Sequence, residues 1–235
     1  MEALISCNDI SVAYDSKEVL TDLSFEINEG DYLCIVGENG SGKSTLVKTL
    51  LSLKQPSKGK ILFSPKLKRD QIGYLPQRTQ IQSDFPACVW EIVLLGCINK
   101  NKAYPFYTKA QRELAQDTLE TLRISELKKR SFKELSIGQQ QRVLMARALC
   151  ATEHLLFADE PVSGLDPLIT TQLYEVLKTI NDTGITVVTV SHDIKSAVRY
   201  ASHILHLKNE ALFFGSKDDY LKTSLAEKYI GEDKC

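Results

Sequence analysis

The stretch GENGSGKST at residues 37–45 decides the fold, because it matches the pattern G-x-x-x-x-G-K-[S/T] of a phosphate-binding loop. The apolar segment YLCIV at 32–36 precedes it and is predicted to be a buried β-strand, and a helix is predicted to begin at Ser44. A glycine-rich turn between strand and helix lets backbone amides and the positive end of the helix dipole approach a phosphate chain. The sequence therefore predicts an α/β core that binds a nucleotide.

The loop positions have separate predicted roles. Three glycines allow the tight turn, Lys43 supplies positive charge to the β and γ phosphates during catalysis, and the Ser44 hydroxyl ligates Mg²⁺. The loop by itself leaves open whether the nucleotide is ATP or GTP, and whether the chain is a kinase, a GTPase or a transporter ATPase. The candidate nucleotide-binding residues of the loop are Gly37, Glu38, Asn39, Gly40, Ser41, Gly42, Lys43, Ser44 and Thr45.

Two further apolar runs end in residues that suit phosphate chemistry. LLFADEP at 155–161 is predicted to be a strand that ends in two carboxylates, of which Asp159 would hold Mg²⁺ through water. Glu160 is the best candidate for the general base that takes a proton from the attacking water. The run ITVVTV ends at Ser191 and His192, and the imidazole of His192 is expected at the same rim, orienting that water.

The remaining pattern divides the chain into lobes. Alternating segments near 5–14, 23–27 and 61–63 predict antiparallel strands, and the region between Gln77 and about Leu135 is mostly amphipathic helix, clearest at 109–122. We expect one domain over 1–235, with a core and β lobe at about 1–80 and 150–235 and a helical lobe at about 81–149.

Composition excludes several classes of protein. A net charge of -1 argues against a general nucleic-acid binder, so no nucleic-acid partner is expected. No stretch approaches the roughly 20 apolar residues of a membrane span, and the N-terminus lacks the pattern of a secretory signal, so a cytoplasmic location is expected. Buried free thiols are favoured over disulfides or metal ligands for Cys7, Cys34, Cys88, Cys97, Cys150 and Cys235.

A family resemblance rests on LSIGQQQRV at 135–143, which lies just before LLFADEP and resembles the ABC signature followed by Walker B. Tyr14 resembles the aromatic residue that stacks on adenine, Gln77 the Q-loop glutamine that also ligates Mg²⁺, and His192 the switch histidine. SGLD at 163–166 resembles the D-loop and adds Asp166. The resemblance implies a P-loop NTPase core of ABC type, a mixed sheet flanked by helices, with an antiparallel β subdomain and an inserted α-helical subdomain.

The resemblance also implies an ATPase that works as a head-to-tail dimer of two copies with two ATP molecules between them. Each ATP would contact the phosphate loop of one copy and the signature of the other, through Ser136, Gly138 and Gln139, where a helix over 139–150 is expected to begin. The usual signature is LSGGQ, and Ile137 stands at its first glycine. An isoleucine cannot adopt a positive φ without a steric cost, and this puts the rate of ATP hydrolysis in question.

The segment at 82–100 and the later AYPFYTKAQRE are similar to the ATPases of zinc and manganese uptake systems. That similarity implies a peripheral subunit on the cytoplasmic face of the membrane, docked on an integral permease and served indirectly by an extracytoplasmic metal-binding protein. A siderophore or haem importer, or a soluble non-transport ABC-type ATPase, is the alternative. His203 and His206 are expected on opposite faces of a strand, as structural or solvated histidines rather than zinc ligands. Aromatic residues that could contact the permease or fill the helical lobe are Phe85, Trp90, Tyr104, Phe106 and Tyr107.

Overall fold

A computed structural model describes residues 3–15, 17–77, 86–98 and 106–231. The chain forms two compact units, of which the first joins the residues up to Leu67 with those from Leu177 onward, and the second runs from Lys68 to Val176. Among the residues that the structure describes, none of the helices combines the length and the hydrophobicity of a membrane-spanning segment.

The first unit contains an antiparallel sheet in the spatial order β2-β1-β4. Its strands are β1 (Ala3–Tyr14), β2 (Lys17–Asn28) and β4 (Lys58–Phe63). Buried and exposed residues alternate along much of β2, as expected for a strand with one face on a core. This sheet confirms the predicted antiparallel β subdomain.

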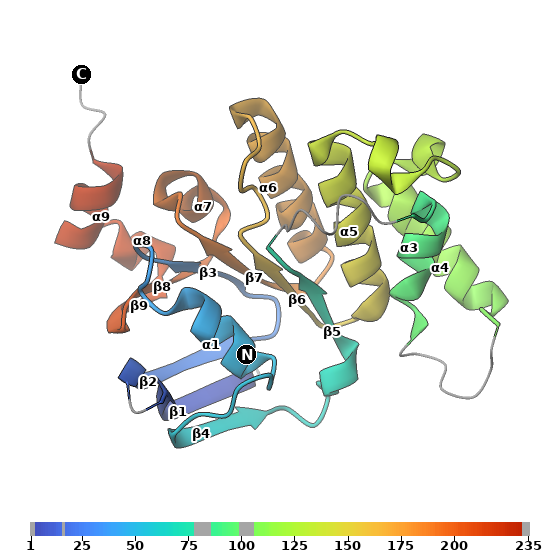
Figure 1. The fold of residues 1–235 in the computed structure, drawn as a ribbon. Helices are drawn as coiled ribbons and strands as arrows, with labels where there is room; N and C mark the ends of the chain where they lie inside the picture. The colour runs from blue at the N-terminus through green and yellow to red at the C-terminus, as the bar shows by residue number, and fades with distance from the viewer. Residues whose placement is uncertain (1–2, 16, 78–85, 99–105, 232–235) are drawn as a thin grey trace. The chain divides into compact units, whose positions relative to one another are not determined.

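The first unit also contains four strands in the order β7-β3-β8-β9, drawn side by side in Figure 1. They are β3 (Tyr32–Val36), β7 (Thr186–Ser191), β8 (His203–Lys208) and β9 (Glu210–Ser216). β3 runs parallel to both β7 and β8, and β9 is antiparallel to β8. Every residue of β3 and β7 is buried, which fits continuous apolar runs in a parallel sheet.

Short helices also belong to the described part of the first unit: α1 (Lys43–Leu50), α7 (Ile194–Tyr200), α8 (Lys217–Tyr220) and α9 (Ser224–Ile230). α7 packs against β3 and β7, and α8 packs against β8 and β9. The side chain of Asp193 caps α7 by accepting the amide of Ser196, so this helix begins directly after the end of β7.

The second unit pairs β5 (Ile72–Leu75) in parallel with β6 (Leu155–Asp159). α5 (Ile137–Ala151) packs on β5, and α3 (Val89–Leu95) and α4 (Lys109–Thr121) pack on α5, as Figure 1 shows. The described part of the region between β5 and β6 is thus mainly helical.

Shorter elements connect these helices. 3₁₀ turns lie at Arg69–Gln71, Ser125–Leu127 and Phe132–Glu134, and α6 (Pro167–Asp182) runs from the second unit into the first. The expected lobes at about 1–80 with 150–235 and at 81–149 stay a prediction.

Most strands and helices predicted from hydrophobic periodicity are confirmed to within about three residues, but β2 begins at Lys17, six residues ahead of the predicted segment 23–27. The helix expected over 139–150 begins two residues earlier, at Ile137. The side chain of Ser136 caps the helix by accepting the amide of Gln139, and this cap places the first turn ahead of the predicted start.

The cysteines of the described residues are free thiols, and Cys7, Cys34, Cys97 and Cys150 are buried, as predicted. Burial raises the pKa of the Cys7 and Cys34 thiols to about 12. Cys88 is half-buried, and Cys235 lies outside the described residues.

Candidate active site

The phosphate loop leaves β3 at Gly37 and enters α1 at Lys43. A Cβ atom on Gly37 would lie 2.3 Å from the carbonyl oxygen of Leu207, so only glycine allows this approach of the loop to β8. Gly42 has a φ of 96° and lies against Leu20 of β2, where a Cβ would also clash. The glycines therefore fix a tight turn that ends in a helix N-terminus.

Lys43 is buried at the start of α1, and its ammonium contacts the loop itself. Its Nζ donates to the carbonyl oxygens of Gly37 at 2.7 Å and Glu38 at 2.8 Å. These contacts hold a positive charge beside the backbone that the motif assigns to phosphate binding. Ser44 is exposed on the first turn of α1 and Thr45 is half-buried.

Strand register places His192 at the same sheet edge as the loop. Val36 at the end of β3 pairs with Ser191 at the end of β7, so Gly37 and His192 are the next residues of two neighbouring parallel strands. His192 is exposed there. Tyr14 ends β1 and is 40% exposed, with the Lys54 ammonium 4.2 Å from its ring centroid. The face of the Tyr14 ring is thus in cation–π contact with Lys54.

In the second unit the structure brings Gln77 and the two carboxylates together. Leu75 of β5 pairs with Ala158 of β6, so the residues that follow both strands share one edge. The Nε2 of Gln77 donates to Oε2 of Glu160 at 2.8 Å. Asp159 is buried at the end of β6. The amide of Gln77 thereby orients the carboxylate proposed as the base.

Glu160 has a φ of 46°, although it is not a glycine. Residues other than glycine rarely adopt this left-handed backbone conformation, and backbone strain of this kind clusters at functional sites. Sequence reasoning missed it, because a D-E-P string gives no sign of the backbone conformation at its middle residue. The backbone here directs Glu160 away from the regular path of β6.

Sequence reasoning also missed a contact made by Tyr74. Its hydroxyl lies 3.5 Å from Oδ2 of Asp159. Burial raises the pKa of Tyr74 to about 12, and the negative charge of Asp159 adds to this rise. Residues at alternate positions of paired strands share a face, so the pairing of Tyr74 with Phe157 explains the contact. Predicting this contact would have required the register of β5 on β6, which no local sequence pattern contains.

The signature residues form the N-terminus of α5. Ser136 Oγ accepts the amide of Gln139 at 3.3 Å, and Gln139 Oε1 accepts the amide of Ser136 at 3.0 Å, a reciprocal capping box. Ile137 has no positive φ and is 43% exposed on the first turn, so the helix start does not require the backbone conformation that isoleucine disfavours. At Gly138 a Cβ would lie 2.9 Å from Ile169 of α6, so the second glycine is the one that the packing requires.

Asp166 precedes α6, and its Oδ1 accepts the amide of Ile169 at 3.0 Å, which caps the helix. Of the aromatic residues singled out above, Trp90 is half-buried under the Lys128 ammonium, 3.7 Å from its ring, and Phe106 is 78% exposed. Phe85 and Tyr104 lie outside the described residues.

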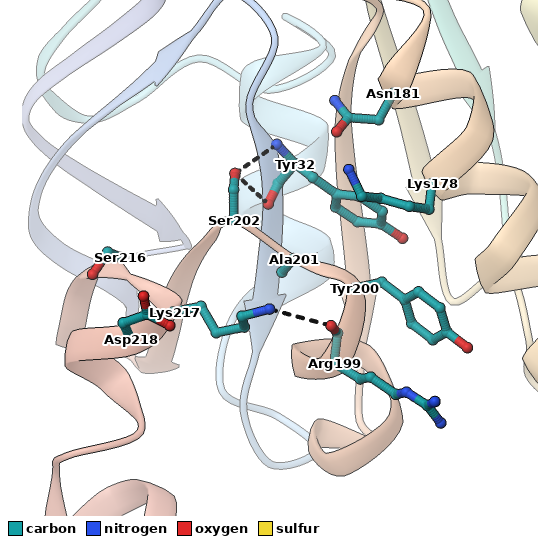
Figure 2. A pocket seen from close by; sticks show the side chains of 10 residues that line it. All are labelled: Tyr32, Lys178, Asn181, Arg199, Tyr200, Ala201, Ser202, Ser216, Lys217 and Asp218. Atoms are coloured by element: carbon teal, nitrogen blue, oxygen red, sulfur yellow. Dashed lines mark hydrogen bonds between the residues drawn. The ribbon is translucent and has the colours of Figure 1, made fainter.

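A cavity of 470 Å³ in the first unit is separate from the phosphate loop (Figure 2). Tyr32 lines it, and Tyr32 begins β3, whereas the loop follows the end of that strand. Lys217 Nζ donates to the backbone carbonyl of Arg199 at 3.3 Å, and both residues line the cavity. Ligands of parallel sheets bind at the carboxyl ends of the strands, so this cavity is not part of the nucleotide site.

Comparison with known proteins agrees with this geometry. The family model described as ABC transporter matches residues 20–163. The manganese transport system ATP-binding protein MntB of Bacillus subtilis (strain 168) is 36% identical over 97% of this chain and 92% of that protein. The zinc uptake system ATP-binding protein ZurA of Listeria innocua serovar 6a is 31% identical over 100% of this chain and 97% of that protein.

A solved structure extends the comparison to three dimensions. It is the dimeric post-hydrolysis state of an ATP-binding cassette bound to ADP and Pi, and it is 28% identical to this chain. The match has a TM-score of 0.75 and covers 91% of this chain and 98% of that chain. These matches confirm the predicted α/β fold class, nucleotide binding and ATPase activity. The chain therefore belongs to the ABC transporter family.

Proposed function

We propose that the chain is the ATP-hydrolysing subunit of an importer of manganese or zinc ions. It works on the cytoplasmic face of the membrane and drives a separate permease. The proposal of ATP hydrolysis rests on the hydrogen bond from Gln77 to Glu160, the residue that follows Asp159. This bond gives the carboxylate of the proposed general base a fixed orientation. The transport part is supported by the relatives, whose names describe manganese and zinc systems.

In the proposed mechanism the phosphate loop binds the nucleotide. Backbone amides at the start of α1 and the Lys43 ammonium attract the β and γ phosphates, and the ring of Tyr14 stacks on the adenine. Glu160 Oε1 accepts a proton from the water that attacks the γ-phosphorus, while its Oε2 stays bonded to Gln77. His192 orients that water and hydrogen-bonds the γ-phosphate. Asp166 serves at the dimer interface.

The residues assigned to Mg²⁺ offer hard oxygen donors, which is the set that this ion prefers. Asp159 provides a buried carboxylate, and Ser44 an exposed hydroxyl. Because Nε2 of Gln77 donates to Glu160, the side-chain oxygen of Gln77 is the atom that would ligate the cation. When bound, Mg²⁺ neutralises charge on the β and γ phosphates.

Two copies of the chain are required in this proposal. The dimeric cassette to which the chain is similar supports a dimer, in which Ser136, Gly138 and Gln139 of one copy contact the ATP held by the loop of the other. A permease is the membrane partner, with the exposed Phe106 and the half-buried Trp90 as contact candidates. An extracytoplasmic metal-binding protein delivers the ion to that permease.

The exchange Glu160→Gln tests the base. It should lower the rate of ATP hydrolysis by about 10²- to 10⁴-fold and let an ATP-bound dimer accumulate, because proton transfer is lost while the loop is intact. Glu120→Gln is the matched control, since Glu120 Oε1 also accepts from a glutamine, Gln116, at 2.8 Å on α4. The control should hydrolyse ATP normally, and a Glu160→Gln protein that does the same would refute the assignment.

Reconstituted vesicles test the transported ion. The chain with its copurified permease should move Mn²⁺ or Zn²⁺ across the bilayer only when MgATP is supplied on the side of this chain. The Glu160→Gln assembly should move neither ion, because transport depends on hydrolysis. Movement of a ferric chelate or of haem, without movement of either free ion, would overturn the substrate assignment.

A further inference from the structure

The C-terminal part of the chain contacts the phosphate loop. Tyr229 lies on α9, and its hydroxyl donates to Oε1 of Glu38 at 2.8 Å. Glu38 is the second residue of the loop, and its carbonyl oxygen accepts a hydrogen bond from Lys43. Both residues belong to the first unit. A side chain far along the sequence therefore reaches the loop at the residue that also contacts its lysine.

Tyr229 packs on His206 of β8, and His206 is in turn held by Tyr220 of α8. The ring centroid of Tyr229 lies 5.1 Å from that of His206, and His206 Nδ1 is 2.8 Å from the hydroxyl of the fully buried Tyr220. His206 pairs with Val36, the last residue of β3 before the loop. The support behind Tyr229 is thus a buried pair, His206 on the strand next to the loop and Tyr220 on α8.

The same strand and the turn after it contact the loop at two more points. The carbonyl of Leu207 is the atom that a Cβ on Gly37 would meet, and the amide of Asn209 donates to the carbonyl oxygen of Ser41 at 3.0 Å. Two of these contacts involve backbone atoms of the β8 region. The contact of Tyr229 with Glu38 is the one made by side chains alone, so it can be removed without altering the others.

Electrostatics at Glu38 favour its charged form. The hydrogen bond from Tyr229 holds the pKa of the Glu38 carboxyl below its usual range, and the charges of Lys228 and Lys208 act in the same direction. A hydrogen bond from a hydroxyl to a carboxylate is stronger than one between neutral groups. The contact is therefore suited to fixing the side chain of an exposed loop residue.

We propose that Tyr229 is a positioning residue, which acts through Glu38 to hold the phosphate loop in the conformation that binds nucleotide. This inference rests on the proposed function as an ATPase. Preorganising a binding loop improves affinity, because less conformational freedom is lost when the ligand arrives. Tyr229 does not touch the nucleotide in this proposal.

The exchange Tyr229→Phe keeps the ring on His206 and removes only the hydroxyl. Calorimetric titration with MgATP should show a Kd raised about three- to tenfold, the range expected for one hydrogen bond. Steady-state assays should show a similar rise in KM with nearly unchanged kcat, because ground-state binding is what weakens. Tyr200→Phe is the matched control, since Tyr200 lines the cavity of Figure 2 at the opposite end of β3, and it should leave Kd unchanged.

Two further measurements separate positioning from general damage. In Tyr229→Phe the pKa of the Glu38 carboxyl, followed by NMR, should rise toward its usual value while the melting temperature stays close to that of the unaltered protein. In a Glu38→Ala background, Tyr229→Phe should cause no further rise in Kd. An unaltered chain that fails to bind MgATP would overturn the proposed function, whereas normal binding by both the unaltered chain and Tyr229→Phe would overturn only this inference.

Discussion

At the scale of single residues, the two central positions of the signature differ in what they tolerate. Ile137 points an exposed side chain outward from the first turn of α5, with no positive φ. Gly138 is buried, and its Cα faces the branched side chain of Ile169 on α6. A side chain is therefore acceptable at the first position and excluded by packing at the second.

This difference predicts a small stability cost for an exchange at the first position and a larger one, of different origin, at the second. Ile137→Gly should lower the free energy of unfolding by about 0.5 kcal/mol, through helix propensity, and leave ATP hydrolysis near its normal rate. Gly138→Ala should cost about 1 kcal/mol or more, because Ile169 must move. Urea unfolding measures both. The Gly138→Ala cost should shrink in an Ile169→Ala background, and an equal cost in both backgrounds would contradict the packing explanation.

At the scale of elements, β8 shows how far sequence reasoning reaches. The apolar run at 204–207 predicted a strand with His203 and His206 on opposite faces, and β8 confirms the strand. The pattern could not say which face is covered. His206 is buried beneath Tyr220 and Tyr229 of α8 and α9, whereas His203 Nδ1 lies 3.3 Å from a carboxylate oxygen of Asp31 and stays half-buried.

The same limit applies to the candidate site. The phosphate loop, the acidic strand end and the signature helix are local in sequence, so pattern and spacing found them. The contacts of Tyr74 with Asp159 and of Tyr229 with Glu38 join residues that are distant in sequence. They depend on strand register and on where the C-terminal helices pack, and neither is a property of a short window.

The burial of His206 predicts a pH dependence of stability. Burial lowers the pKa of His206, the charges of Lys228 and Lys43 lower it further, and the Glu38 carboxylate opposes them. The unfolded chain, with a histidine pKa of about 6.5, therefore binds a proton before the folded chain does, and the free energy of unfolding falls as the pH drops below that value. Urea unfolding between about pH 7.5 and 5.5 should show a weaker decline in His206→Gln. His203→Gln should retain the decline due to His206.

At the scale of the whole molecule, the residues assigned to ATP divide between the two units. The phosphate loop, Tyr14 and His192 belong to the first unit, and Glu160 with the signature helix belongs to the second. In the proposed dimer, the signature of one copy serves the ATP on the loop of the other. Each copy would then supply parts of two separate sites. A loop defect in one copy and a signature defect in the other would damage the same site and leave the second site intact.

Mixing inactive variants tests this arrangement. In a mixture of equal parts Lys43→Ala and Ser136→Arg, random pairing makes half of the dimers mixed, and each of these has one intact site, so about a quarter of the normal ATPase activity should return. A mixture of the unaltered chain with the double variant should also retain about a quarter, because only its unaltered homodimers stay active. If each chain formed its site alone, the first mixture would be inactive and the second would retain about half. The paired results thus distinguish a shared site from a self-contained one by activity alone, with the same substitutions present in both mixtures.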